Sequence, residues 1–126
     1  MGRILVIDDD PDVVESTQIV LESRGHEVAG AGSREEGMRA VEEFAPDLII
    51  LDVMMEQADD GIAMAQELRK KGFAAPIMML SGIGRLSGMD YGKDGSLVPV
   101  DDFQEKPIDP IVLIEKVDAL LSRKED

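Results

Sequence analysis

Two short aliphatic runs, ILVI at positions 4–7 and LIIL at positions 48–51, constrain the fold of this 126-residue chain more than any other feature. A strand with one face in water alternates apolar and polar residues, whereas an uninterrupted apolar run is typical of a strand buried on both faces. Such strands belong to parallel sheets that are covered by helices on each side. We therefore predict a parallel sheet between two helical layers.

The rest of the chain has the alternation that such a sheet requires. Amphipathic helices are predicted at about 11–23, 34–44, 60–71 and 110–124, and further short strands at about 26–32, 75–82 and 101–107. Asp10, Ser33 and Asp109 are placed to cap three of these helices, and Ser33 with Glu36 forms a capping box. Strand and helix alternating in this way predict one α/β domain over residues 1–126 with a doubly wound parallel sheet.

The pattern fails between Ser81 and Val100. This segment contains five glycines and one proline, which makes it a poor helix by intrinsic propensity. A connection of this length without regular structure is uncommon in a compact domain, and where it occurs it is often functional. We predict an irregular segment here.

Composition excludes several classes of function. The net charge is −14, so we expect no direct nucleic-acid binding by this chain, because phosphates would be repelled. There is no cysteine, hence no disulfide and no thiolate metal site. No apolar stretch is long enough to cross a membrane, and the N-terminus lacks the pattern of a signal peptide. We expect a cytoplasmic protein without membrane insertion, whose single histidine, His26, is exposed.

Polar residues close the predicted strands. Asp8 and Asp9 follow the first strand and Asp52 ends the third, while Ser81 and Lys106 follow the fourth and fifth. The carboxyl ends of parallel strands meet at one edge of the sheet, where ligands bind in folds of this kind. Oxygen-rich anions suit Mg²⁺, and a hydroxyl and an ammonium group suit a phosphoryl group. Asp52 would then be a carboxylate nucleophile.

With these motifs in order, the chain resembles the receiver domain of two-component response regulators. The resemblance extends over the whole chain, through ILVIDDDPD, LIILDVMM, MMLSG and DDFQEKPI. It implies a flavodoxin-like, five-stranded sheet of order 2-1-3-4-5. It also implies a role for each motif residue: Asp52 as phosphoacceptor; Asp8, Asp9, Asp52 and the carbonyl of Met54 as Mg²⁺ ligands; Ser81 and Phe103 as switch residues; and Lys106 as the partner of a phosphoryl oxygen.

The same resemblance implies a function. A stand-alone receiver would accept a phosphoryl group from a sensor histidine kinase or phosphotransfer protein and would switch a surface that binds a downstream protein target. It would not be an enzyme beyond Mg²⁺-dependent self-phosphorylation and self-dephosphorylation. We expect the second reaction to be slow, because Met54 and Ile83 offer no polar group to orient a hydrolytic water.

Other functions remain open at this point. A receiver-like module that no longer needs phosphate would dock partners through residues 81–100. A metal-dependent phosphatase would also use Asp52, but such enzymes generally have a second acid two residues later, where this chain has Met54. A flavin binder would need a phosphate-cradling loop after the first strand, where DDDPD would repel phosphate.

Overall fold

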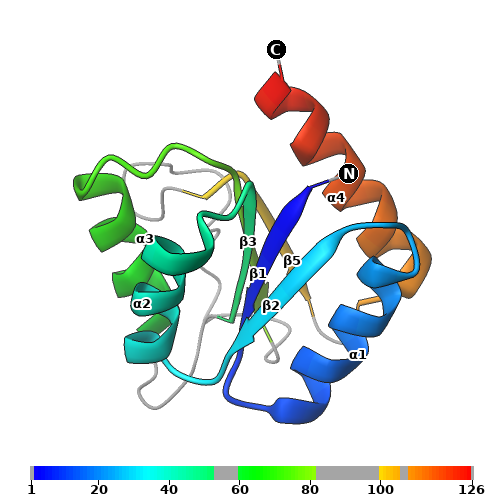
Figure 1. Ribbon diagram of the computed structural model, residues 1–126, viewed down its shortest axis with the longest axis horizontal. Helices are drawn as coiled ribbons and strands as arrows, with labels where there is room; N and C mark the ends of the chain where they lie inside the picture. The colour runs from blue at the N-terminus through cyan, green and yellow to red at the C-terminus, as the bar shows by residue number, and fades with distance from the viewer. Residues whose placement is uncertain (1, 53–59, 82–99, 106–107, 126) are drawn as a thin grey trace.

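The computed structural model describes residues 2–52, 60–81, 100–105 and 108–125. The elements follow one another as β1 (Arg3–Ile7), α1 (Pro11–Glu22), β2 (Glu27–Ala31), α2 (Arg34–Phe44), β3 (Leu48–Asp52), α3 (Asp60–Lys70), β4 (Ile77–Ser81), β5 (Asp102–Glu105) and α4 (Pro110–Glu125) (Figure 1). The strands form one parallel sheet of order β2-β1-β3-β4-β5, as predicted. Most of the glycine-rich segment, residues 82–99, lies outside the described residues. Within the described ranges, no helix combines the length and the apolar character that a membrane span needs.

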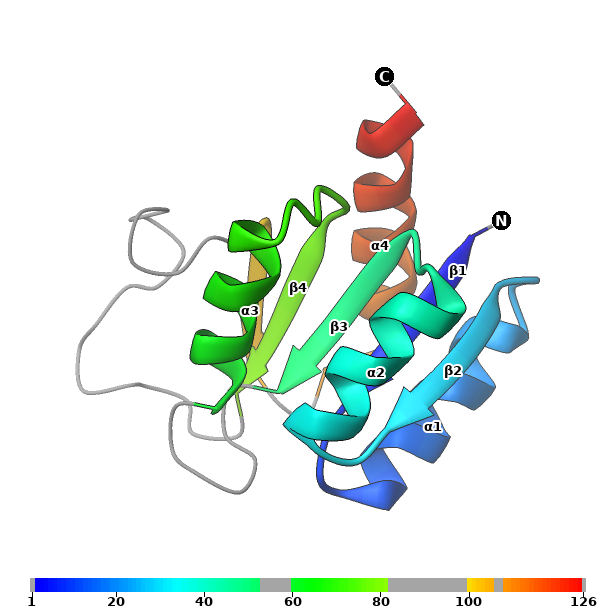
Figure 2. The ribbon, with the colours of Figure 1, turned by 60° about the vertical axis from the view of Figure 1, so that its left-hand side comes forward.

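Helices cover both faces of the sheet, with α2 and α3 on one side and α1 and α4 on the other (Figure 2). Alternate residues of each central strand enter opposite cores. Leu5 and Ile7 pack in the core on the α2 and α3 side, whereas Ile4 and Val6 pack in the core on the α1 and α4 side. All four are fully buried. This two-sided burial confirms the interpretation of the uninterrupted apolar runs.

The helix starts agree with the sequence. Each predicted cap accepts a backbone N–H from the first turn of its own helix: Asp10 from Asp12 at 3.0 Å, Ser33 from Glu36 at 3.1 Å and Asp109 from Ile111 at 2.8 Å. The return bond of the capping box differs slightly, because the Glu36 carboxylate accepts from Gly32 N at 2.9 Å, one residue before the cap. The helices α1 and α3 each end one residue earlier than predicted.

An arginine at the end of α3 fixes the start of β5, and no sequence pattern predicted it. The Arg69 guanidinium donates to the carbonyl oxygens of Phe73 and Ala75, both at 2.8 Å, and to the Asp101 carboxylate at 2.9 Å. The same Asp101 oxygen accepts from Ile77 N at 2.9 Å. Arg69 and Asp101 therefore join α3, the loop before β4 and the residue before β5.

The prediction that His26 is exposed is wrong. Only 8% of this residue is accessible, and its Nδ1 accepts a hydrogen bond from Gly2 N at 3.1 Å. Its Nε2 lies 3.6 Å from a carboxylate oxygen of Asp118 on α4. His26 immediately precedes the edge strand β2, where the N-terminal residues and α4 cover it. Those two segments are distant in the sequence, so the local pattern around His26 could not indicate its burial.

Candidate metal centre

The register of the two central strands brings two of the predicted acids together. Ile7 of β1 is paired with Leu51 of β3. Asp8 follows Ile7 and Asp52 follows Leu51, so the two acids lie side by side at the carboxyl ends of the two strands. Asp8 extends the ladder by one bond, because its N–H donates to Ala31 O of β2 at 3.0 Å. The backbone of this site is thus held by the carboxyl ends of three neighbouring strands, β2, β1 and β3.

The turn that follows β1 fixes the Asp8 carboxylate. Its Oδ1 accepts a hydrogen bond from Asp10 N at 2.9 Å, and Asp10 in turn caps α1. The position of this carboxylate is therefore tied both to the sheet and to the first turn of a helix. Such a site needs little rearrangement to bind a ligand, since the strand ends and the helix cap already hold it.

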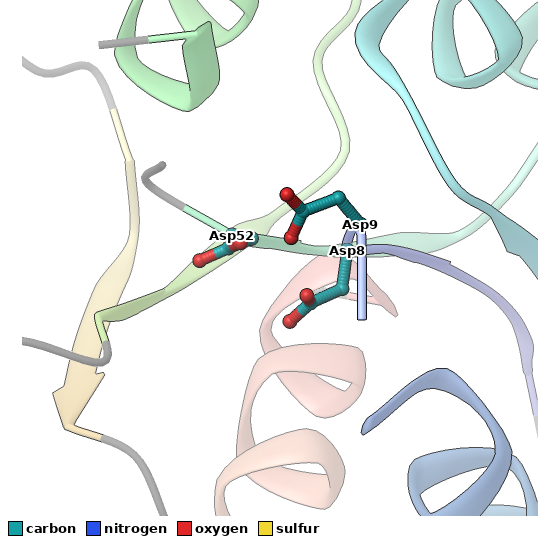
Figure 3. A group of neighbouring side chains, drawn as sticks. All are labelled: Asp8, Asp9 and Asp52. Atoms are coloured by element: carbon teal, nitrogen blue, oxygen red, sulfur yellow. The ribbon is translucent and has the colours of Figure 1, made fainter. Parts of the chain in front are cut away.

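Asp8, Asp9 and Asp52 converge, as Figure 3 shows. One carboxylate oxygen from each lies within 4.8 Å of the others. Asp8 and Asp52 are only 2% and 4% exposed, whereas Asp9 is exposed. At this separation two ionised carboxylates repel by roughly 3 kcal/mol if the effective dielectric constant is about 20. An arrangement of this kind favours a bound cation.

The donor set fits Mg²⁺. This ion prefers oxygen ligands, takes one or a few carboxylates, and completes its coordination with water or phosphate oxygens. Oxygens on opposite sides of an octahedral Mg²⁺ lie ~4 Å apart, so carboxylates within 4.8 Å can share one ion with small adjustments or through water. The exposed Asp9 leaves one side of the cluster open to solvent.

The structure describes the other predicted site residues only in part. The backbone of Ser81 ends β4 one residue beyond Leu80, which is paired with Asp52, so Ser81 lies at the same edge of the sheet. The backbone of Phe103 lies in β5, paired with Met79. The residues Met54, Ile83 and Lys106 lie outside the described residues, and their predicted roles stay predictions.

The sequence did not reveal a groove that opens beside the acids. It has a volume of about 590 Å³ and is lined by Asp8, Asp9, Pro11, Val14, Glu15, Gln18, Gly30, Ala31, Gly32 and Glu36. These residues come from the start of α1, the end of β2 and the start of α2. Glu15 and Glu36 are each ordinary exposed helix acids in the sequence, and only the packing of the two helix starts brings them to one groove.

Comparison with known proteins identifies the family. The family model described as the response regulator receiver domain matches residues 4–118, which include Asp8, Asp9, Asp52, Ser81 and Lys106.

Several regulators of transcription are similar to this chain in sequence. The alkaline phosphatase synthesis transcriptional regulatory protein PhoP of Bacillus subtilis is 35% identical over 98% of the chain. The DNA-binding dual master transcriptional regulator RpaA of Synechocystis is 36% identical, as is the DNA-binding response regulator MtrA of Mycolicibacterium smegmatis, each also over 98% of the chain. The match covers 50–52% of these proteins, so the chain spans about half of their length.

Solved structures agree with the sequence comparison. A CheY-like receiver domain protein from Methanospirillum hungatei is 26% identical with a TM-score of 0.86, and the match covers 99% of this chain and 97% of that one. The receiver domain of the Francisella response regulator 1452 is 27% identical with a TM-score of 0.85, over 98% of both chains. The domain model, the relatives and the fold agree, and the chain belongs to the response regulator receiver domain family.

Proposed function

We propose that this chain accepts a phosphoryl group on Asp52 from a sensor histidine kinase or a phosphotransfer protein. The observation that carries the proposal is the position of Asp52: a carboxylate at the end of a fully buried strand, with the oxygens of Asp8 and Asp9 within 4.8 Å. In the transfer, a carboxylate oxygen of Asp52 forms the new O–P bond. The P–N bond of the phosphohistidine breaks, and its electron pair stays on the imidazole nitrogen.

The neighbouring residues have separate tasks in this proposal. Asp8, Asp9 and the carbonyl of Met54 would hold Mg²⁺ together with Asp52. When bound, the ion would neutralise the charge that gathers between the carboxylates and the phosphoryl oxygens. The Ser81 hydroxyl and the Lys106 ammonium bind oxygens of the transferred group. Asp52 is only 4% exposed at the end of β3, between β1 and β4, and this burial would limit the access of water to a phosphorylated Asp52.

Phosphorylation would act through the switch residues. Ser81 and Lys106 would be drawn toward the phosphate and Phe103 would move, which would change the surface near β5 and α4 that a downstream protein recognises. We infer that the chain has no substrate to turn over and only dephosphorylates itself slowly. A cytoplasmic location fits a receiver that meets a kinase and a transcriptional partner. The relatives named as DNA-binding regulators make DNA a possible downstream partner of a protein that contains this chain, whereas its charge of −14 argues against contact through the receiver itself.

Intact-mass spectrometry after treatment with acetyl phosphate tests the proposal. We expect one added phosphoryl group that requires Mg²⁺ and is lost in Asp52→Asn. The matched control is Asp12→Asn, which makes the same chemical change at an exposed acid of α1 and should keep the adduct. An adduct that persists in Asp52→Asn would refute the assignment of the phosphoacceptor. If neither acetyl phosphate nor beryllofluoride with Mg²⁺ changes the protein, the phosphate-independent interaction module replaces this proposal.

A further inference from the structure

The groove beside the metal centre, which we call the α1/β2 groove, has walls of two kinds. Carboxylates of Asp9, Glu15 and Glu36 stand around it, all three on exposed residues. Pro11 and Val14 form an apolar wall on the α1 side. Gly30, Ala31 and Gly32, at and just after the end of β2, add lining with little or no side chain, and we call this part of the lining the floor. In Figure 1 the turns from β1 to α1 and from β2 to α2 meet at the same lower end of the sheet.

The acids of the groove are partly held in place. The Glu36 carboxylate accepts a hydrogen bond from Gly32 N at 2.9 Å, which keeps it over the floor. Glu15 is on α1, whose start is fixed by the Asp10 cap. Among the ten lining residues, all of them described, none is a lysine or an arginine. The groove therefore presents several acceptors from two helices to anything that enters it.

These walls point to one kind of ligand. A small inorganic cation would use the carboxylates and leave the apolar wall of Pro11 and Val14 without contact. A long side chain with an apolar stem and a cationic end matches both features, because its methylene groups can lie along apolar surface while its charge meets the acids. Arginine is favoured over lysine, because its planar group has five donors and can reach carboxylates on different sides of the groove. The volume of about 590 Å³ is within the roughly 300–1,000 Å³ of binding pockets for small molecules.

We propose that the α1/β2 groove binds an arginine side chain of the protein that delivers the phosphoryl group. Asp8 and Asp9 line both the groove and the metal centre, so an arginine bound there would place its protein beside Asp52. That the arginine belongs to the phosphoryl donor rests on the proposed function, whereas the binding of an arginine side chain in the groove does not. Recognition by opposite charge at the rim would select the partner and speed its approach more than it would raise affinity.

A titration followed by ¹H–¹⁵N NMR tests this binding directly. The probe is N-acetyl-arginine methylamide, added to the unphosphorylated protein in saturating Mg²⁺, so that the metal centre is filled throughout. We expect saturable shifts of the Gly30 and Gly32 amides, which form the floor. The neutral citrulline analogue, which has nearly the same shape, should bind at least tenfold more weakly. Since no phosphoryl transfer occurs, the outcome is independent of whether Asp52 is ever phosphorylated.

Paired variants separate the groove from the general negative charge. Glu15→Gln and Glu36→Gln should each weaken binding about threefold, the effect of losing one solvent-exposed ion pair. Glu22→Gln on α1 and Glu43→Gln on α2 make the same change on exposed residues outside the groove and should leave binding unchanged. Equal weakening by the control variants, equal binding of the citrulline analogue, or no saturable shift of the Gly30 and Gly32 amides in saturating Mg²⁺ would each overturn the proposal. Unaltered spectra elsewhere establish that each variant is folded.

Discussion

Replacing Asp8 by asparagine should make the metal-free protein more stable. Asparagine keeps the shape of the side chain and an oxygen that can accept from Asp10 N, but it removes a charge from a group that is 98% buried. The oxygens of Asp52 and Asp9 lie within 4.8 Å. With an effective dielectric constant of about 20, the repulsion from Asp52 is roughly 3 kcal/mol, and that from the exposed Asp9 is smaller because water screens it. We expect a gain of about 1–3 kcal/mol in the free energy of unfolding.

Mg²⁺ should reduce the advantage of the variant, because it stabilises the wild-type protein more. A ligand that binds only the folded state stabilises it by about 2.7 kcal/mol at a concentration 100 times its dissociation constant. The wild-type protein should gain about this amount from Mg²⁺, and Asp8→Asn should gain less because it has lost a carboxylate ligand. The advantage of the variant in EDTA should therefore shrink or disappear in Mg²⁺.

Urea unfolding followed by circular dichroism at 222 nm measures both quantities, which suits a chain without tryptophan. Asp12→Asn is the matched control: it should lose only a few tenths of a kcal/mol, as a charge at a helix N-terminus does, and should gain as much from Mg²⁺ as the wild type. If Asp8→Asn is less stable than the wild type in EDTA, the carboxylates do not destabilise one another as calculated. If Mg²⁺ stabilises the variant and the wild type equally, Asp8 is not part of a metal site.

Three further predictions concern the framework around the site. A Cβ at Gly37 would lie 2.8 Å from Ile7 Cδ1 and 2.9 Å from Met64 Cε. Gly37→Val should therefore lower the free energy of unfolding by about 1–3 kcal/mol, while Gly37→Ala should be nearly neutral, because the flexible ends of the two side chains can shift and alanine favours the helix. Equal losses for the two variants in urea unfolding would contradict this. Arg69→Met keeps the stem but leaves its three acceptors without the guanidinium, and should cost about 2 kcal/mol in the same assay; a loss below about 0.5 kcal/mol would show that this contact is dispensable. The hydrogen bond from Arg34 lowers the pKa of Glu67 below its ordinary value of 4.5. The contribution of the ionised Glu67 to the stability of the folded state is therefore present above pH 4.5 and is lost as the pH falls through the lowered pKa. The stability of the wild type relative to Glu67→Gln should therefore decrease on acidification, and a difference that does not vary with pH would exclude this linkage.

The sequence was informative where a property depends on residues close together in the chain. The ILVI and LIIL runs predict strands buried on both faces, because each residue of such a strand must face one of two apolar layers. The caps at Asp10 and Asp109 were predicted because the donor and acceptor are separated by two residues. The acids of the site were predicted for a related reason: parallel strands place their carboxyl ends at one edge, whatever the details of packing.

Features that depend on distant partners were not predictable in this way. Arg69 and Asp101 are 32 residues apart, and the chain between them includes the glycine-rich segment. His26 was predicted to be exposed at the start of a strand, yet Gly2 and Asp118 approach it from both ends of the chain. The α1/β2 groove likewise depends on how far apart two helix starts lie. All three features result from packing between elements that are distant in the sequence, and neither hydrophobic periodicity nor motif spacing predicts such packing.

The position of the acids explains how the fold tolerates them. Asp8 and Asp52 follow Ile7 and Leu51, which are fully buried and paired across β1 and β3, so the backbone of both acids is held by strands whose burial does not depend on the charges. We therefore expect the repulsion among the carboxylates to lower the stability of the whole domain without displacing the site. A rigid site with unfavourable charge gains more from a cation than a flexible one, because no ordering of the chain offsets the electrostatic gain. On this reasoning we expect the stability lost to the acid cluster to make the folded protein responsive to Mg²⁺.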